Sequence, residues 1–385
     1  MSGDKKTAAL NPSAPTDGGQ LSHLNKNSIA ENPVQDNPYM EKTDMETEEF
    51  FRQLQDPNFL QTVSMTQLFD SVYPGKPAII EDFLHTGVYL FAGAPKVGKS
   101  FFMGQLAYHV SKGLPLDGRK VHQGAVLYLA LEDTYHRLQS RLYRMFGTEV
   151  TSELHFAVCA KLLGEGLEEQ VAGFLSRHEN TRLVIVDTLQ KIRRMERENC
   201  SYALDYAVMG RLKTLADQNK ICVLVVHHTR KEESAGGQRF ARISGTNGLF
   251  GVADGAFLME KDPQQTQGAT LEVTGRDQPD QRFRLKRDPQ TLTWQMECEK
   301  EELWKEPPDP VLEAVAAVIH PEQPQWKGTA TELVACLPLD IKPNALSMLL
   351  NVRASRLLHE YGIQYENRRE HSGRYIKLTL LLPEA

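Results

Sequence analysis

One glycine-rich segment restricts the fold of this chain more than any other feature. The apolar run VYLF precedes it, and the helical pattern FFMGQLAYHVSKG follows it. Its residues are Gly93, Ala94, Pro95, Lys96, Val97, Gly98, Lys99 and Ser100. Glycines in such a segment let backbone N–H groups turn inward around a phosphate, and the helix that begins there adds partial positive charge. The pattern therefore predicts a strand–loop–helix unit, a P-loop, that binds ATP.

Two residues at the end of this segment have separate predicted roles. Lys99 is expected to reach the terminal phosphates of ATP, and the Ser100 hydroxyl is expected to bind Mg²⁺. Phe101 follows directly in the chain, and we count it with the nucleotide-binding residues. ATP and Mg²⁺ are thus the predicted cofactors.

Apolar runs alternate with helical patterns over the middle of the chain. The runs VYLFAG, AVLYLAL, LHFAVCA, LVIVDTL and ICVLVVHH are almost continuously apolar, as strands covered on both faces must be. After residue 254 only strand patterns remain, which indicates hairpins at one edge of the sheet. This order predicts an α/β fold with a mostly parallel central sheet and antiparallel edge strands.

Composition divides the 385 residues into four parts. Residues 1–62 are polar and poor in large aliphatic side chains, so we expect a disordered tail. Residues 63–300 form the predicted ATPase domain, and 301–309, with tandem prolines, form a linker. Residues 310–385 show three helical patterns and a hairpin, which predicts a small α+β domain that looks like a winged helix.

Charge and cysteine usage restrict the class of protein. The formal net charge is -6, so any binding to nucleic acid must come from local basic patches. The five cysteines form no CxxC pair, and a reduced, cytoplasmic chain without a zinc site fits them. No apolar run reaches the roughly 18 residues of a membrane helix. We therefore expect a cytoplasmic protein without a membrane partner.

A carboxylate follows one buried strand in the pattern typical of a Walker B motif. LVIVDTLQ ends its apolar run at Asp187. An aspartate at a strand end is otherwise a common helix cap, so this position indicates a metal-binding role only because the chain also has a P-loop. We predict that Asp187 organises the Mg²⁺ bound by Ser100.

A second carboxylate follows the strand VLYLAL. Glu132 stands where no solvated face requires a charge, and a general base that polarises the attacking water fits this place. Either Glu132 or Asp133 could instead cap the next helix. We predict that Asp133 is the cap and that Glu132 is the catalytic base.

Two histidines end the strand VLVVHH. A polar side chain at the tip of a central strand can contact the γ-phosphate and transmit its loss to the loop that follows. We predict this sensor role for His228 ahead of His227. A surface position without function is the alternative.

Taken together, these motifs resemble the RecA-type ATPase core, in which a catalytic glutamate follows the strand after the P-loop helix. The residue after Asp187 is Thr188, so the place that many other P-loop enzymes give to the base holds no carboxylate. The chain resembles more narrowly the RepA-like hexameric replicative helicases of plasmids and mobile elements. GAPKVGKS, LED, VDTLQK, HHTRK and SGTNGL carry this resemblance, which covers about residues 75–300.

The resemblance implies an active site completed by a neighbouring subunit. An arginine finger would neutralise charge that develops in the transition state. Arg276 ends a late strand and is the first candidate, and Arg242 is the second, because Ser244-Gly245-Thr246 departs from the Arg-Gly-Ser stretch of the family. A surface arginine paired with Asp277 is the alternative.

The resemblance also implies a residue that stacks on the adenine. Arg141, on the helix after Glu132, is the first candidate for this contact. Arg137 or Tyr135 could serve instead.

In RecA-type rings, two loops line the channel and grip single-stranded DNA. The corresponding segments here are QKIRRMERENCSY and TRKEESAGGQRFARIS. Their candidate contacts are Arg193, Arg194, Arg230, Lys231, Arg239 and Arg242. Solvated loops without a ligand are the alternative.

The last part of the chain carries a second basic patch. Residues 342–378 hold seven Lys or Arg against three Glu. The candidate DNA contacts here are Arg353, Arg368, Arg369 and Arg374. Winged helices also dock on proteins, which is the alternative use of this surface.

The leading hypothesis is a Mg²⁺-dependent ATPase that forms a ring, a hexamer by its resemblance, and moves along or unwinds DNA. Single-stranded DNA, other copies of the chain and replication proteins would then be its partners. A DNA-binding ATPase that regulates, loads or assists recombination without unwinding is the second hypothesis. A winged-helix adaptor with a ligand-gated scaffold is the third, and a KaiC-like kinase is the fourth.

Overall fold

The structure is a computed structural model, and it describes most of the chain from residue 60 onward. The described residues are 60, 62–193, 202–229, 247–262, 267–276, 278–298, 307–370 and 373–381. The chain divides into two compact units, Met1–Leu60 and Gln61–Ala385. The predicted disordered tail and most of the predicted linker lie outside the described residues, and all the elements named below belong to the second unit.

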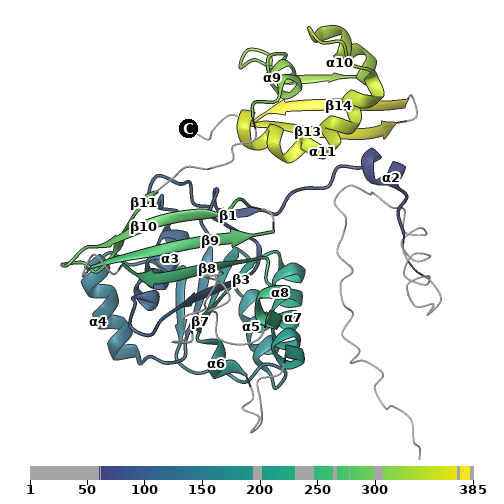
Figure 1. The fold of residues 1–385 in the computed structure, drawn as a ribbon. Helices are drawn as coiled ribbons and strands as arrows, with labels where there is room; N and C mark the ends of the chain where they lie inside the picture. The colour runs from purple at the N-terminus through teal and green to yellow at the C-terminus, as the bar shows by residue number, and fades with distance from the viewer. Residues whose placement is uncertain are drawn as a thin grey trace, which may run out of the picture. The chain divides into compact units, whose positions relative to one another are not determined.

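A nine-stranded sheet is the centre of the predicted ATPase part (Figure 1). From one edge to the other its strands are β11 (Trp294–Cys298), β10 (Gln281–Arg287), β9 (Gly268–Gly275), β8 (Gly255–Lys261), β3 (Gly87–Gly93), β7 (Cys222–His228), β6 (Thr181–Asp187), β4 (Ala125–Ala130) and β5 (Leu154–Ala157). Neighbouring strands from β8 to β5 are parallel, and those from β8 to β11 are antiparallel. The predicted α/β class, with a mainly parallel sheet and antiparallel edge strands, is confirmed.

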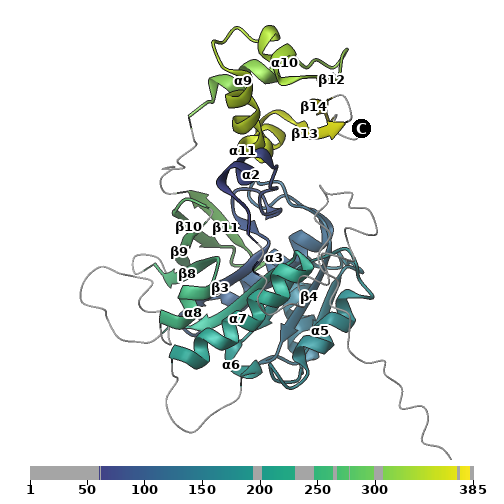
Figure 2. The ribbon, with the colours of Figure 1, turned by 90° about the vertical axis from the view of Figure 1, so that its right-hand side faces the viewer.

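Helices cover both faces of this sheet (Figure 2). One face packs against α3 (Lys99–Lys112) and α4 (Tyr135–Phe146). The other packs against α5 (Leu167–Leu175), α6 (Leu189–Ile192), α7 (Tyr202–Asn219) and α8 (Asn247–Val252). None of the helices in the described parts of the chain is long and apolar enough to cross a membrane.

The side chains of β3 show why its sequence is apolar throughout. Tyr89 and Phe91 point into the core beneath α3, where Phe91 stacks on Phe102 with ring centroids 5.5 Å apart. Val88 and Leu90 point into the core beneath α7. Side chains alternate along a strand, so a strand buried on both faces has no position for a charged residue.

The order of the strands brings the predicted catalytic motifs to one edge. Strand β7 lies between β3, which leads into the P-loop, and β6, which ends at Asp187. Strand β4, which precedes Glu132, pairs with the other side of β6. These four strands are parallel, so their carboxyl ends and the residues that follow them lie at the same edge.

The C-terminal part contains helices α9 (Pro310–Ala316), α10 (Ala330–Cys336) and α11 (Pro343–Tyr361). Its antiparallel sheet has the order β12 (Gln325–Gly328), β14 (Gly373–Leu380) and β13 (Ile363–Glu370). Leu312, Leu346 and Leu378 belong to a separate apolar core. The three predicted helices and the hairpin are present, whereas β12 was not anticipated.

Two short elements precede the P-loop strand. Helix α2 (Met65–Asp70) contacts α11, because the side-chain amide of Asn351 donates to the backbone oxygen of Phe69 at 2.8 Å. A small hairpin, β1 (Ala78–Ile80) and β2 (Leu84–His85), then leads into β3. The predicted domain boundaries stay predictions.

Candidate active site

The predicted P-loop is a turn between β3 and α3. Gly98 has a φ of 112° and begins α3 without a side-chain cap. A β-carbon on Gly98 would stand 2.6 Å from Cζ2 of Trp294. The position therefore requires glycine for its backbone conformation and for space. N–H groups in the first turn of a helix have no partner one turn earlier in the helix, so this end of α3 suits the predicted binding of a phosphate.

The ammonium of Lys99 is buried inside this turn. Its Nζ donates to the backbone oxygens of Gly93 at 2.7 Å and Ala94 at 3.0 Å. Burial lowers the pKa of Lys99 to about 8, although the charges of Asp187 and Glu132 act in the opposite direction. A phosphate that approached this ammonium would favour the charged form and raise that pKa.

Two oxygen ligands suited to Mg²⁺ meet at the end of β6. The hydroxyl of Ser100 is hydrogen-bonded to the carboxylate of Asp187, and a shared metal ion there stays a prediction. Burial raises the pKa of Asp187, and the hydrogen bonds from Tyr128 and Ser100 oppose that shift. Mg²⁺ at phosphate sites usually has one or two protein ligands, with water and phosphate oxygens completing its shell. Ser100 and Asp187 fit such an ion.

Tyr128 is a member of this site that the sequence did not indicate. Its ring is fully buried on β4, and its hydroxyl donates to Oδ2 of Asp187 at 2.9 Å. This bond fixes the orientation of the Asp187 carboxylate across two neighbouring strands. A tyrosine within an apolar run looks like an ordinary core residue, so only the pairing of β4 with β6 reveals it.

Glu132 lies just beyond the end of β4, at the edge that carries the P-loop. The hydroxyl of Thr188 donates to Oε1 of Glu132 at 3.1 Å, and Thr188 directly follows Asp187. The carboxylate is otherwise open to solvent. This geometry holds Glu132 beside the predicted metal site, and its role as general base stays a prediction.

The predicted capping role of Asp133 is wrong. Thr134 is the N-cap of α4, and its side chain accepts a hydrogen bond from the backbone N–H of Arg137. The carboxylate of Asp133 instead forms ion pairs, with the guanidinium of Arg141 at 2.7 Å and with that of Arg137 at 3.3 Å. Threonine at 134 has the ordinary preference of an N-cap residue, and the arginines of the first turns attract the carboxylate.

His228 contacts the P-loop lysine, whereas His227 is buried. Nδ1 of His228 lies 3.2 Å from Nζ of Lys99. Burial lowers the pKa of His228, and the charge of Lys99 lowers it further, while Glu132 and Asp187 oppose the shift. Because the ammonium of Lys99 can only donate, a neutral His228 that bonds to it accepts at Nδ1 and carries its proton on Nε2. The order of preference, His228 before His227, agrees with this contact.

The predicted base-stacking residue, Arg141, lies over the ring of Phe101 at 5.1 Å. Arg287 lies over the same ring at 4.1 Å and over Trp294 at 5.6 Å. These two arginines come from α4 and β10, which are far apart in the sequence. Arg287 was not anticipated, because a basic residue in an edge strand has no distinctive local pattern.

Trp294 joins the edge of the sheet to the P-loop helix. The side chain of Gln105 donates to the backbone oxygen of Trp294 at 2.8 Å and accepts from its backbone N–H at 2.7 Å. The indole packs against Gly98 and is 3% exposed. Sequence reasoning missed both residues, which lie 189 positions apart in the chain.

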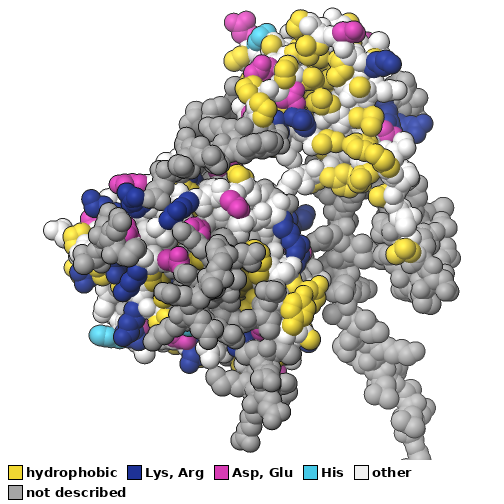
Figure 3. All heavy atoms as spheres, in the orientation of Figure 1, with side chains coloured by type: hydrophobic (Ala, Val, Ile, Leu, Met, Phe, Trp, Pro, Cys, Tyr) yellow, Lys and Arg dark blue, Asp and Glu magenta, His cyan; other side chains and the backbone are white. Residues whose placement is uncertain are grey.

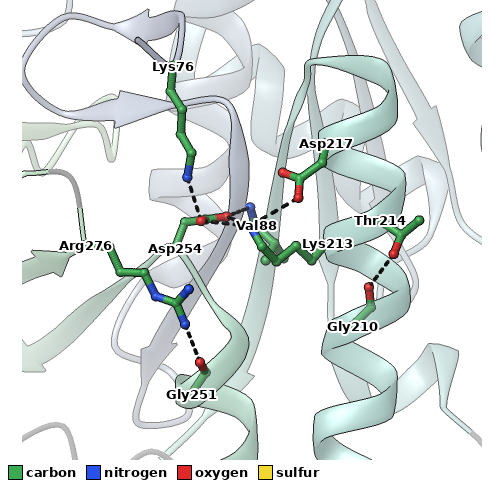
Figure 4. A network of polar contacts seen from close by, with 9 residues as sticks. All are labelled: Lys76, Val88, Gly210, Lys213, Thr214, Asp217, Gly251, Asp254 and Arg276. Carbon is green, nitrogen blue, oxygen red and sulfur yellow. Dashed lines mark hydrogen bonds and ion pairs between the residues drawn. The ribbon is translucent and has the colours of Figure 1, made fainter. Parts of the chain in front are cut away.

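Arg276, the first candidate for an arginine finger, follows the end of β9 (Figure 4). Its guanidinium donates to the backbone oxygen of Gly251 in α8, and its N–H donates to that of Asp254. The carboxylate of Asp254 accepts from Lys76 at 2.6 Å and from Lys213 at 2.9 Å. Asp277 lies outside the described residues, and so does the pairing considered as the alternative.

Five of the predicted nucleic-acid contacts lie outside the described residues. They are Arg194, Arg230, Lys231, Arg239 and Arg242. Arg193 is described, and its guanidinium pairs with the buried Asp205 of α7 at 3.1 Å. Part of the segment predicted as a long loop is the short helix α6.

The basic residues of the C-terminal part pair with carboxylates. The ion pairs are Arg353–Asp309 at 2.6 Å, Arg368–Glu366 at 3.0 Å and Arg374–Asp70 at 3.0 Å. Arg369 is exposed on β13. Hydrophobic side chains gather on the surface over α2 and α11 (Figure 3), where Met65, Met348 and Val352 are exposed. This surface is less basic than the composition of residues 342–378 suggested.

Residues 55–234 match the family model of the AAA domain (AAA_25). No curated protein matches the sequence. Among solved structures, one ATPase domain is similar at 13% identity and a TM-score of 0.47, over 66% of this chain and 98% of that one. A structure of a DnaB-like replicative helicase and its interactions with primase is similar at 12% identity and a TM-score of 0.48, over 65% and 70%. The matched residues include the P-loop, Glu132, Asp187 and His228, and the chain is an ATPase.

Proposed function

We propose that this ATPase is a Mg²⁺-dependent, cytoplasmic motor of the RepA-like, RecA-type class. It would assemble as a ring, move along or unwind single-stranded DNA, and serve the replication or maintenance of a plasmid or mobile element. One observation supports this proposal above the others. The end of β4 carries Glu132, the end of β6 carries Asp187, and a hydrogen bond from Thr188 joins Glu132 to the β6 end.

The proposed roles in hydrolysis follow from the contacts at this edge. Lys99 would exchange its bonds to Gly93 and Ala94 for oxygens of the β- and γ-phosphates. Mg²⁺, when bound to Ser100 and Asp187, would neutralise charge on the same phosphates. Tyr128 keeps Asp187 in its orientation through a buried hydrogen bond.

Glu132 would accept the proton of the attacking water. Its carboxylate is exposed at the edge of the site, and the hydroxyl of Thr188 donates to Oε1. That hydrogen bond orients the carboxylate, and Oε2 would be the oxygen that accepts the proton. His228 would act as the sensor, because Nε2–H can donate to the γ-phosphate while Nδ1 accepts from Lys99. Loss of the γ-phosphate would end that donation.

The strand register supports an arginine finger that acts between subunits. Gly255 pairs with Tyr89 on β3 and with Gly275 on β9, whereas Gly93 pairs with Met259. Arg276 follows Gly275, so five residues of strand, roughly 17 Å, separate the level of Arg276 from that of the P-loop. Arg276 would then serve the nucleotide of a neighbouring subunit and not its own.

The first experiment measures ATP hydrolysis by the purified protein with and without single-stranded DNA, together with its mass by light scattering. We expect stimulation by DNA and the mass of a ring. In Glu132→Gln, ATP binding should persist while turnover falls by at least about 100-fold, the range of a lost general base. Glu179→Gln, at an exposed position, is the matched control and should hydrolyse ATP normally. Full activity of Glu132→Gln would reject the assignment of the base.

A DNA-binding ATPase that regulates or loads other proteins is the second candidate. The exposed Met348 and Val352 on α11 favour it, since apolar surface suits a protein partner better than a phosphate backbone. Strand-displacement assays separate the two functions. A ring that hydrolyses ATP on DNA but displaces no strand would favour the loader over the motor.

A further inference from the structure

An exposed pair of tyrosines lies at the beginning of α7. Tyr202 is 53% exposed and Tyr206 is 51% exposed. Their rings stack with centroids 6.0 Å apart and an interplanar angle of 26°. The pair is not part of the catalytic edge described above, and no role in the ATPase site accounts for it.

Helical geometry explains why the two rings lie together. Residues three and four positions apart lie on one face of a helix, and the buried Asp205 and Met209 adjoin the two tyrosines, so the rings lie at the exposed margin of the buried side of α7. A single exposed aromatic ring is ordinary, but two stacked rings form one larger exposed aromatic surface. The pair therefore offers a surface on which another planar group can stack.

A third exposed aromatic ring belongs to the neighbouring helix. Helix α8 packs against α7 in both views (Figures 1 and 2), and its Phe250 is 42% exposed. The hydroxyl of Tyr202 lies 3.9 Å from where a β-carbon of Gly251, the next residue, would stand. We call Tyr202, Tyr206 and Phe250 the aromatic platform.

The platform has a position and a chemical setting that suit an anionic polymer. Helix α7 is the first helix after α6, which follows the carboxyl end of β6, the edge that carries Asp187. The sequence that leads into α7 is basic, with four Lys or Arg against two Glu in residues 191–201. The sequence that leads into α8 is basic as well, again with four against two in residues 230–246.

We propose that the aromatic platform stacks on the bases of single-stranded nucleic acid. Proteins that bind single strands combine basic residues along the backbone with aromatic rings on which bases stack. The stacking is tolerant of sequence because every base has a π-face. This inference rests on the proposed function, since it adds base contacts to a protein that is proposed to bind DNA. A second copy of the chain is a less suitable occupant because the flanking sequences of every copy share the same positive charge.

The test compares two probes of equal length and charge, an oligo(dT) strand and the same backbone without bases. Wild-type protein should bind oligo(dT) about fivefold or more tightly than the abasic strand, as expected for loss of a base stacked on an aromatic ring. This comparison needs no variant and does not depend on the folding of a mutant. Both affinities are measured by fluorescence anisotropy at one salt concentration, since phosphate contacts depend on salt.

Variants assign the preference to the platform. The double variant Tyr202→Ala/Tyr206→Ala should lose the preference and bind both probes with the affinity of the abasic strand. Tyr202→Phe/Tyr206→Phe keeps the π-faces and should retain it. The matched control Tyr73→Ala/Tyr143→Ala removes two exposed tyrosines outside the platform and should behave as wild type.

Each remaining outcome overturns a defined part of the inference. Equal affinity of wild type for both probes would reject the platform and leave the proposed DNA motor in place. An unchanged preference for oligo(dT) in Tyr202→Ala/Tyr206→Ala would do the same. A lower oligomeric mass of that variant without DNA would identify the rings as a subunit contact and reject base stacking. No binding of wild type to either probe would reject the proposed function and the platform together.

Discussion

The buried ammonium of Lys99 makes the affinity for ATP depend on pH between 7 and 9. Burial lowers the pKa of Lys99 to about 8 in the protein without nucleotide. The protonated fraction is therefore about nine-tenths at pH 7, about half at pH 8 and about one-tenth at pH 9. If only the ammonium form holds the phosphates, the apparent Kd is the intrinsic Kd divided by this fraction. Raising the pH from 7 to 9 should increase the Kd about tenfold.

Isothermal titration calorimetry measures the same linkage directly. ATP adds negative charge beside Lys99 and raises its pKa, so binding at pH 8 should take up about half a proton. The uptake is obtained from binding enthalpies in buffers that differ in ionisation enthalpy. Lys99→Arg is the matched control because guanidinium remains charged over this range. In this variant only the pH dependence of ATP itself should remain.

Two results would refute the reasoning about Lys99. A Kd of wild type that changes no more than that of Lys99→Arg between pH 7 and 9 would show that Lys99 keeps an ordinary pKa. Proton release at pH 8 instead of uptake would show that the bound phosphates do not favour the ammonium form.

Two further substitutions test buried contacts. Tyr128→Phe removes the donor to Asp187, and because hydrogen bonds to charged groups contribute about 1.5–3 kcal/mol, the free energy of unfolding in urea should fall by that amount. A loss well below 1 kcal/mol would show that the hydroxyl does not orient the carboxylate. Asp254→Asn removes the ion pairs with the partly exposed Lys76 and Lys213, and we expect the free energy of unfolding to fall by about 1–3 kcal/mol at pH 7. Burial raises the pKa of Asp254, but the hydrogen bonds from its partners outweigh burial and lower it below its ordinary value of 3.8. The charged carboxylate therefore contributes its full stabilisation above pH 3.8, and this contribution is lost as the pH falls through the lowered pKa of the folded protein. A difference from wild type that grew below pH 3.8 would contradict this sign.

Local patterns were sufficient wherever one segment carries the whole signal. The P-loop needs only a strand, a turn with φ values open to glycine and a helix, all within residues 87–112. The apolar runs predicted β3, β4, β6 and β7, because a strand buried on both faces leaves no polar position. Strand ends then located Asp187, Glu132 and His228.

Helix capping shows the limit of such local reasoning. Asp133 and Thr134 are both good N-cap residues, and the sequence offers no means to choose between them. The choice depends on Arg141, whose guanidinium reaches Asp133 at 2.7 Å. A side-chain contact further along the helix thus decided which residue caps it.

Strand pairing decided the features that no single segment carries. Tyr128 reaches Asp187 because β4 lies beside β6, and Gln105 holds Trp294 across 189 positions of sequence. The level of Arg276 on the sheet follows from the antiparallel pairing of β9 with β8. Periodicity identifies strands and motifs from neighbouring residues, so local sequence patterns were enough to predict the P-loop and the carboxylates at the strand ends. Contacts between distant segments depend on the order and direction of the strands, which only the folded chain specifies.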